Sequence, residues 1–442
     1  MENDQYIIET SPKLTGIADL TGAKNAVLVI MASLLLTSGK SKLTNVPYSQ
    51  DVIHMIALLE SLGATIIFDQ EAHILFVDTT DVRTWIVCPN IMKKMRASIL
   101  VMGPLLARFA RAKIALPGGC VIGSRPIDLH IKNFKKMGAL FSQEDEYVSV
   151  MLPTLKSGTY VLEYPSVGAT ENILMASILA QGITKIINAA LEPEVIDLIC
   201  ALSKMGAHIT VIAPATIEIR GVTQLRPIEH MIIPDRLEAG ALLLASAITG
   251  GHISIPQARA DMMDVFLLKL EEMGHTVISG INGIGIMIQA TNTPQAVSFK
   301  TGPYPGFPTD LQAPMMVAQT IAQGTSVIEE TVFENRMLHV RELQKMGAQI
   351  DVRYNKAIIT GVDALYGASV IASDIRASCA LMLAGFVANG ITCMTGLMHF
   401  RRGYDQLDKK LSLLGARITL LETPDIQGQM QQSKEEQKEL DN

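Results

Sequence analysis

Six copies of one short unit constrain the fold of this chain more than any other feature of its sequence. Each copy is an apolar helical segment followed by Leu or Met, then Gly, then Ala or His, then a strand-like run, as in "IALLESLGATII". The glycines are Gly63, Gly138, Gly206, Gly274, Gly347 and Gly415, spaced 68 to 75 residues apart. Glycine directly after a helix readily adopts the left-handed conformation that ends it. Each copy therefore predicts a helix that ends at glycine and a strand that starts at once.

A second helical segment precedes each copy and is apolar almost all round. These segments are "GAKNAVLVIMASLLL", "RASILVMGPLLA", "GATENILMASILAQG", "EAGALLLASAITGG", "DLQAPMMVAQTIAQG" and "RASCALMLAGFVANG". A helix without a polar face is expected in the interior, whereas the helices that end at glycine carry polar outer faces. The pattern predicts an inner and an outer helix in each unit.

Six such units predict an α/β protein built as three units plus three, giving two pseudo-threefold domains. A chain of 442 residues is also too long for one compact core. The boundary is expected at 220–236, where "RGVTQLRPIEHMIIPDR" interrupts the pattern with two prolines. The polar tail, residues 422–442, is expected to be disordered.

Composition excludes several classes of function. The 5 cysteines show no CxxC spacing, so neither a structural zinc nor a disulfide framework is expected. The 37 basic and 43 acidic residues include no basic run typical of nucleic-acid binding. The longest apolar run, 26–36, is shorter than the roughly 20 residues that a bilayer requires, and the first residues show no targeting pattern. We expect a cytoplasmic protein without membrane insertion, whose anionic ligands are bound by a local cluster of cations.

The segment "LPGGCVIGSRPIDLH", 116–130, is the first candidate for chemistry. Two glycines before Cys120 indicate that it lies on a pliable loop. Pro126 suits the first turn of a helix, so Arg125 is expected at a helix N-terminus, which favours anions. One interpretation is a reactive thiol beside an anion site, with cations lowering a thiol pKa that is ordinarily about 8.5. The alternative is a tight turn in which Cys120 is only a small residue.

Four cations occupy equivalent corners of related units: Lys24, Arg96, Arg376 and Arg402. Lys24 and Asn25 stand at the start of the first inner helix, where a cation is unfavourable unless an anion lies nearby. The cations are predicted to converge, although a solvated lysine at a loop edge is the structural alternative for Lys24.

Asp310, in "GFPTDLQAP", precedes the fifth inner helix. It is interpreted either as an ordinary N-cap, for which Asp is a preferred residue, or as a general base that faces a cleft between domains.

Taken together, "GAKNA", "NVPYSQDV", "LPGGCVIGSRPIDLH", "PSVGATENILMA", "FPTDLQAP" and "RRGYDQLDKKLSLLGA" resemble the enolpyruvyl transferase family that acts on UDP-N-acetylglucosamine. The resemblance covers about 13–421. It implies two inside-out α/β barrel domains with a cleft between them. The first would span 22–233 and the second would combine 1–21 with 234–421.

The resemblance also implies roles for individual residues. Cys120 would protonate C3 of phosphoenolpyruvate as general acid, and Asp310 would accept the proton of the sugar 3′-hydroxyl. The cations Lys24, Arg125 and Arg402 would hold the phosphate and carboxylate of phosphoenolpyruvate, with Arg96 and Arg376 lining the site. Residues in contact with the nucleotide sugar would be Asn25, Arg125, Pro126, Ile127, Asp128, Leu129, Ser166, Val167, Gly168, Asp310 and Val332.

The reaction implied by the resemblance adds the 3′-hydroxyl of UDP-N-acetylglucosamine to C2 of phosphoenolpyruvate and then expels phosphate, as the first committed step of peptidoglycan synthesis. No metal or cofactor and no nucleic-acid partner is expected, and the chain is expected to be a monomer. The chain has Tyr164 and Pro165 where some members have a nucleotide-binding lysine, so nucleotide affinity could differ.

Two alternatives stay open at this point. One is the related transferase that acts on shikimate 3-phosphate, although that enzyme lacks the cysteine loop. The other is a catalytically silent paralogue with a binding role, which predicts the loss of a key residue. Lys24, Asn25, Cys120, Asp310 and Arg402 are all present.

Overall fold

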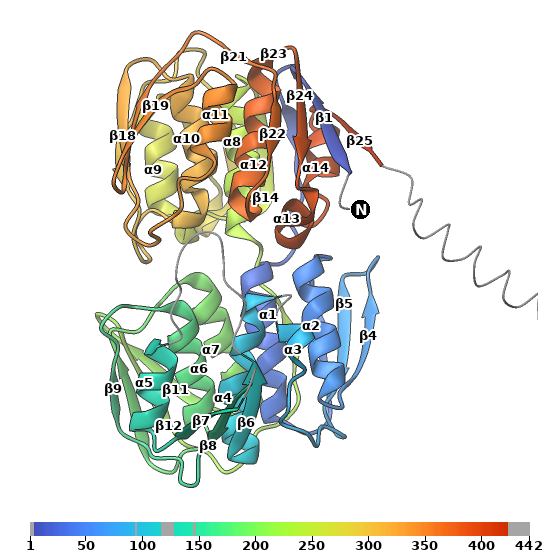
Figure 1. Ribbon diagram of the computed structural model, residues 1–442, viewed down its shortest axis with the longest axis vertical. Helices are drawn as coiled ribbons and strands as arrows, with labels where there is room; N and C mark the ends of the chain where they lie inside the picture. Colours follow the sequence, from blue (N-terminus) through green and yellow to red (C-terminus); the bar gives the residue numbers. More distant parts are fainter. Residues whose placement is uncertain (1–3, 93–94, 116–127, 145–146, 423–442) are drawn as a thin grey trace, which may run out of the picture.

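Two bodies lie end to end along the long axis of the molecule (Figure 1). The computed structural model describes residues 4–92, 95–115, 128–144 and 147–422. The chain starts in one body, enters the other at α1 (Lys24–Ser33) and returns before α8 (Arg236–Ile248). The two connecting segments lie side by side, because Gly22 and Pro234 form an antiparallel bridge.

The apolar segments form inner helices, as predicted. Nine of the ten residues of α1 and twelve of the thirteen residues of α8 are buried. The first body also contains η2 (Arg96–Val101) with α4 (Met102–Phe109), and α6 (Val167–Ser177). The second body contains α10 (Gln312–Thr320) and α12 (Ile375–Val387) beside α8. Buried side chains on every face of these helices explain why their sequences lack a polar stripe.

The outer helices end at the six glycines, as predicted. These helices are α2 (Gln50–Ser61), α5 (Asp128–Lys136), α7 (Pro193–Met205), α9 (Asp264–Glu272), α11 (Val340–Lys345) and α14 (Leu407–Leu413). The six glycines have φ angles between 92° and 111°, in the region that favours glycine. A strand follows each one within two residues, so the repeated unit folds as its sequence pattern indicates.

Sheets cover the helices on the outside of each body (Figure 1). In the first body, the described sheets are β13 (Glu229–Met231), β3 (Lys40–Thr44), β5 (Ile74–Asp78) and β4 (Thr65–Asp69); β6 (Arg111–Ala115), β8 (Tyr147–Met151) and β7 (Leu140–Glu144); and β11 (His208–Ile212), β12 (Thr216–Arg220), β10 (Ile183–Ile187) and β9 (Thr159–Val161). Their inner faces alternate with exposed positions, as in β10.

The second body repeats this arrangement and includes both N-terminal strands. Its described sheets are β15 (Thr276–Ser279), β16 (Ile284–Gln289), β14 (His252–Arg259) and β2 (Thr15–Ile17); β17 (Phe299–Lys300), β18 (Thr325–Glu329), β20 (Lys356–Thr360) and β19 (Gln349–Arg353); β22 (Ser369–Ile371), β24 (Ile391–Thr395), β1 (Gln5–Glu9) and β25 (Arg417–Leu421); and β21 (Leu365–Tyr366) with β23 (Ala388–Asn389). The remaining elements are η1 (Leu34–Leu36), α3 (Pro89–Met92), η3 (Ala260–Met262), η4 (Ile281–Gly283), η5 (Thr309–Leu311) and α13 (Leu397–Gly403).

Each body has its own hydrophobic core. One cluster of buried side chains runs from Ala23 to Ile232, and the other combines Tyr6 to Leu20 with Leu237 to Ala416. This separation supports the proposed domain bounds of 22–233 and 1–21 plus 234–421.

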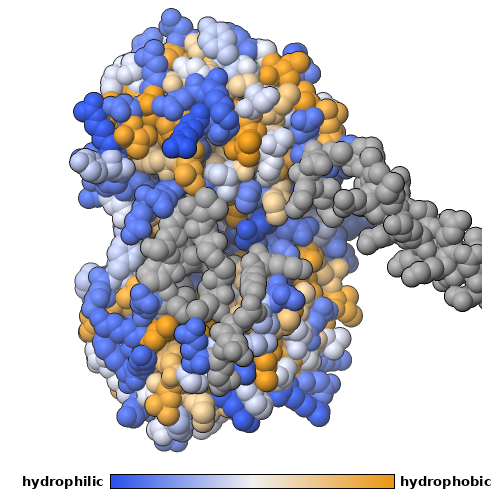
Figure 2. All heavy atoms as spheres, in the orientation of Figure 1, coloured by the Kyte–Doolittle hydropathy of each residue, from blue (hydrophilic) through white to orange (hydrophobic). Residues whose placement is uncertain are grey.

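The described surface is mostly hydrophilic with scattered apolar residues, and a waist separates the two bodies (Figure 2). Among the described residues, no helix is long and apolar enough to cross a membrane.

Candidate active site

Lys24 and Arg402 meet on one carboxylate where the two bodies face each other. Lys24 is the first residue of α1 and only 8% exposed, and its Nζ donates to Oδ2 of Asp51 at 3.1 Å. Nε of Arg402, on α13, donates to Oδ1 of Asp51 at 2.9 Å. Lys24 is therefore not a solvated lysine, and the predicted convergence holds for these two cations.

The electrostatics of Asp51 follow from this position. Burial on its own raises the pKa of the Asp51 carboxyl, but the charges of Lys24 and Arg402 outweigh burial and lower the pKa below its ordinary value. Asp51 is thus a single anion that pairs with two cations from different bodies. An anion such as phosphate can take the same position between them.

Asp310 forms the second cluster. It lies in η5, and α10 starts at Gln312 without a side-chain cap, so the N-cap interpretation of Asp310 is wrong. Instead, Oδ1 of Asp310 accepts from Nη2 of Arg336, and Oδ2 accepts from Nη2 of Arg376 at 3.0 Å. Burial raises the pKa of Asp310, but Arg376 and Arg336 hold it well below its ordinary value. The carboxylate is ionised and can accept a hydrogen bond from a hydroxyl group.

Glu330 holds the chain around Asp310 and Val332. Its Oε1 accepts from the N–H of Val332 at 2.8 Å, and its Oε2 accepts from the hydroxyl of Thr309 at 2.8 Å. Nη1 of Arg336 donates to the same hydroxyl at 2.9 Å. The turn that carries Val332 is therefore fixed relative to Asp310.

Asp235 connects the two clusters. Its Oδ1 caps α8 by accepting from the N–H groups of Leu237 and Glu238 at 2.8 and 3.2 Å, and its Oδ2 accepts from the N–H of Lys24 at 3.3 Å. Burial lowers the pKa of Arg376, but Asp310, Tyr404 and Asp235 raise it well above its ordinary value. Asp235 therefore places a carboxylate at the backbone start of α1, while Asp51 pairs with the Lys24 side chain.

The predicted nucleotide segments start two adjacent helices. Asp128 and Leu129 open α5, and Ser166 caps α6, which starts with Val167 and Gly168. A Cβ on Gly168 would lie 3.5 Å from the His130 ring, so the two helix starts are neighbours. Converging N-termini offer N–H groups and positive dipole ends to an anion such as a diphosphate.

The remaining predicted residues lie on α1, on η2 and in the segment before α5. Cys120, Arg125, Pro126 and Ile127 lie outside the described residues. Arg96 starts η2, and its side chain also lies outside the description. Asn25 is the one residue of α1 that is not buried.

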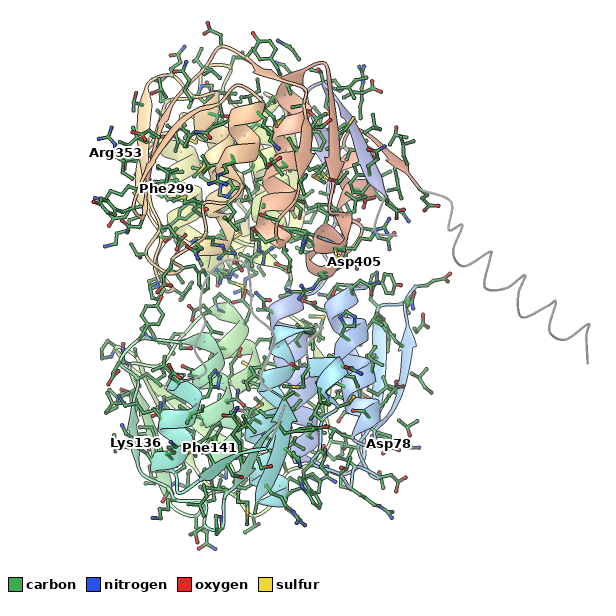
Figure 3. All side chains as sticks on the ribbon, viewed as in Figure 1. Asp78, Lys136, Phe141, Phe299, Arg353 and Asp405 are labelled. Atoms are coloured by element: carbon green, nitrogen blue, oxygen red, sulfur yellow. The ribbon has the colours of Figure 1, made fainter. Side chains whose placement is uncertain are left out.

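A further contact joins the two bodies beside Arg402. Asp405 lies at the edge of the second body next to the waist (Figure 3), and its Oδ2 accepts from the N–H of Tyr48 at 3.0 Å. The segment "RRGYD" therefore faces "NVPYSQD" through two acidic residues, Asp51 and Asp405.

Reasoning from the sequence missed four charged residues: Asp51, Asp235, Glu330 and Arg336. Asp51 belongs to a quoted motif, but no local spacing relates it to Arg402, which is 351 positions away. Among the described residues, no group of three or more His, Cys, Asp and Glu side chains could hold a metal ion.

Comparisons with known proteins identify the family. A family model described as EPSP synthase (3-phosphoshikimate 1-carboxyvinyltransferase) matches residues 8–411. The UDP-N-acetylglucosamine 1-carboxyvinyltransferase 1 of Caldanaerobacter subterraneus subsp. tengcongensis is 46% identical over 414 residues, which are 94% of this chain and 99% of that protein. The UDP-N-acetylglucosamine 1-carboxyvinyltransferase of Saccharophagus degradans is 43% identical over 416 residues, with the same two shares.

Two solved structures share the fold. The enolpyruvyl transferase NikO from Streptomyces tendae superposes with a TM-score of 0.86 at 21% identity, over 95% of this chain and 99% of that one. EPSP synthase from Acinetobacter baumannii gives a TM-score of 0.73 at 17% identity, over 95% and 100%. The predicted α/β fold of enolpyruvyl transferases is confirmed.

Proposed function

Because the chain belongs to the UDP-N-acetylglucosamine 1-carboxyvinyltransferases of the enolpyruvyl transferase family, we propose that it transfers the enolpyruvyl group of phosphoenolpyruvate to the 3′-hydroxyl of UDP-N-acetylglucosamine. The oxygen of the hydroxyl attacks C2 while C3 gains a proton, which gives a tetrahedral intermediate. C3 then loses a proton as the C2–O bond to phosphate breaks. The products are the enolpyruvyl ether and inorganic phosphate, and this is the first committed step of peptidoglycan synthesis.

The observation that carries the proposal is the bridge from Lys24 through Asp51 to Arg402. It brings one cation from each body to a single carboxylate. Phosphoenolpyruvate carries a phosphate and a carboxylate, and both require cations that are held in place before the substrate arrives. In the proposed complex, the phosphate displaces Asp51 from Arg402, with Arg125 as the third cation and Arg96 and Arg376 nearby.

Asp310 is proposed to accept the proton of the 3′-hydroxyl. Its two arginine partners hold its pKa low and make it a weak base, so it cannot remove the proton from a free alcohol in advance. The hydroxyl becomes strongly acidic only as its oxygen bonds to C2. Asp310 therefore orients the hydroxyl first and takes the proton as the new bond forms.

Cys120 is proposed to deliver the proton to C3 and to form a covalent adduct with the same substrate. We expect the Cys120→Ala variant to lose turnover while it keeps its fold, and full activity in that variant would refute the role. A fosfomycin-type epoxide should label Cys120 and none of the other four cysteines. Peptide mapping that finds the label on Cys88 or Cys200 would contradict this assignment.

The proposed nucleotide site uses Asp128, Leu129, Ser166, Val167, Gly168 and Val332, together with Arg125, Pro126, Ile127 and Asn25. The convergence of α5 and α6 supports a diphosphate site there. We further propose that the protein acts in the cytoplasm as a monomer, which size-exclusion chromatography with light scattering tests.

The decisive experiment measures phosphate release from phosphoenolpyruvate with one acceptor at a time. Release with UDP-N-acetylglucosamine and not with shikimate 3-phosphate is the expected result. Release only with shikimate 3-phosphate would replace the proposal with the related transferase. Release with neither would favour the alternative of a catalytically silent paralogue.

A further inference from the structure

Asn172 makes three side-chain hydrogen bonds, and each one goes to a different part of the first body. It lies in the second turn of α6 and is fully buried. Its Oδ1 accepts from the N–H of Gly103 at 2.8 Å. Its Nδ2 donates to the carbonyl oxygen of Ile99 at 3.2 Å and to Nδ1 of His130 at 3.1 Å. Because Gly103 N–H can only donate, the orientation of the amide is fixed.

The first two bonds lie at a break in a helix. In an unbroken α-helix, the N–H of Gly103 would donate to the carbonyl of Ile99, four residues earlier. The segment that the sequence predicts as one helix divides here into η2 (Arg96–Val101) and α4 (Met102–Phe109), where Pro104 has no N–H to continue the helix. The Asn172 amide bonds to both Gly103 and Ile99 and so holds the two pieces at the break.

Close packing makes this insertion possible. A Cβ on Gly103 would lie 2.4 Å from the backbone carbonyl oxygen of Asn172, so only glycine allows α4 to approach α6 this closely. The glycine in "VMGPLLA" is thus explained by the insertion of Asn172 rather than by a turn.

The three partners lie beside the proposed site. Ile99 belongs to η2, which starts at Arg96, and His130 belongs to α5, which follows directly after the segment that contains Cys120. Asn172 itself lies one turn after Gly168. We propose that Asn172 is a positioning residue for the transfer reaction: it sets the turn that starts at Arg96 and fixes that turn relative to α5 and α6. This inference rests on the proposed function, because it assigns Arg96 to phosphoenolpyruvate.

The test is the Asn172→Asp variant, which keeps the side-chain volume and the acceptor for Gly103. The lost Nδ2 donor leaves a carboxylate oxygen opposite the Ile99 carbonyl, which repels it, whereas His130 can place a proton on Nδ1 and donate to that oxygen, so the link to α5 is kept. We expect kcat/KM for phosphoenolpyruvate to fall about 10- to 100-fold, since small displacements of binding groups have effects of this size. The Kd of UDP-N-acetylglucosamine should change less than about threefold, because the cap of α6 by Ser166 stays intact.

Gln319→Glu is the matched control. Gln319 is also a fully buried amide, its Oε1 accepts from the N–H of Val297 at 2.8 Å, and it lies near the end of α10 in the other body. The same chemical change there should leave both substrate constants as in the wild type.

If Asn172→Asp weakens kcat/KM for phosphoenolpyruvate and the Kd of UDP-N-acetylglucosamine by the same factor, the defect is a general structural one and the inference is overturned. Wild-type values of both constants in a folded Asn172→Asp protein would also overturn it. If that variant does not fold, Asn172→Ala removes the three side-chain bonds without adding a charge, and a loss for phosphoenolpyruvate at least about threefold larger than the loss for UDP-N-acetylglucosamine is then required. Activity of the wild type is measured first. Its absence refutes the proposed function and not the role of Asn172 in holding η2 and α4 at the helix break.

Discussion

Asp51 is the residue that most directly tests the phosphate site. Its carboxylate is nearly buried and pairs with Lys24 and Arg402. Asp51→Asn should lower the free energy of unfolding by about 2–4 kcal/mol, since a buried cation then loses its partner. Added inorganic phosphate should recover more stability in the variant than in the wild type, because two cations are left without a carboxylate. Urea unfolding with and without phosphate measures both effects.

The control for Asp51 is Asp81→Asn. Asp81 pairs with Arg83 at 3.1 Å, but both side chains are largely exposed, so its loss should change stability by about 0.5 kcal/mol or less. An Asp51 variant that is no less stable than the Asp81 variant would contradict the assigned pairing.

The pKa of Asp310 gives a prediction about pH. In the folded protein, the pKa of Asp310 lies well below the ordinary value of a carboxyl group. Asp310 therefore stabilises the fold at pH values above its unfolded pKa, and this effect is lost only as the pH falls through the folded pKa. The carboxylate also stays ionised, and able to accept a proton, over the same range of pH. The plot of kcat/KM against pH should therefore show no acid limb from Asp310 above about pH 5. Arg336→Gln removes one of the two cations and should move the acid limb of Asp310 upward, whereas Arg336→Lys should largely keep it in place. An unchanged profile in Arg336→Gln would refute the pairing as the cause.

These residues also show what sequence reasoning could reach. The candidates Lys24, Asp310, Arg376 and Arg402 stand out because each is a charge at the edge of an apolar segment. Their missed partners do not, because pairing depends on distant parts of the chain: Asp51 lies 351 positions from Arg402. A charge that looks unfavourable locally signals that a partner exists without identifying it.

At the level of elements, the helix-ending glycines make a graded prediction. Gly206 has a φ of 109°, and a Cβ added there would meet no atom within 4 Å, so Gly206→Ala meets only the backbone penalty of about 1–2 kcal/mol. At Gly63, with a φ of 104°, a Cβ would also lie 2.6 Å from the carbonyl oxygen of Asp81. Gly63→Ala should therefore lower the free energy of unfolding by at least about 1 kcal/mol more than Gly206→Ala does. Urea denaturation compares the two, and equal losses would show that the close contact relaxes.

The helices and strands also show which structural features a sequence pattern can predict. Each glycine identified the end of its helix because the left-handed conformation is a local requirement. The division of η2 from α4 falls beside Pro104, which is a local signal for a break, but the bond from Gly103 to Asn172, 69 residues further on, was not predictable. The pairing of β1 with β25, in which Tyr6 faces Leu420, is likewise set by packing across the whole chain.

For the molecule as a whole, hydrogen bonds and ion pairs connect the two bodies. They include Arg402 with Asp51, Tyr48 with Asp405, and Arg236 with Glu194, in which Nε of Arg236 donates to Oε1 of Glu194 at 2.9 Å. The described apolar clusters, in contrast, stay within one body each. Polar contacts of this kind hold two domains in register while leaving each core to fold by its own burial of apolar surface.

This separation can be tested with one natural fluorophore. The chain contains a single tryptophan, Trp85, which packs against the core of the first body. Leu35 and Leu381 are both fully buried, the first in that core and the second in the other. Leu35→Ala should shift the urea transition of Trp85 fluorescence to lower concentration, with a loss of about 2–5 kcal/mol, because the substitution leaves a cavity. Leu381→Ala should shift the transition seen by circular dichroism and leave the Trp85 transition close to that of the wild type. If Leu381→Ala moves the Trp85 transition by the same amount as Leu35→Ala, the two cores unfold as one cooperative unit. The contacts between the bodies would then couple the cores far more strongly than the proposed domain division allows.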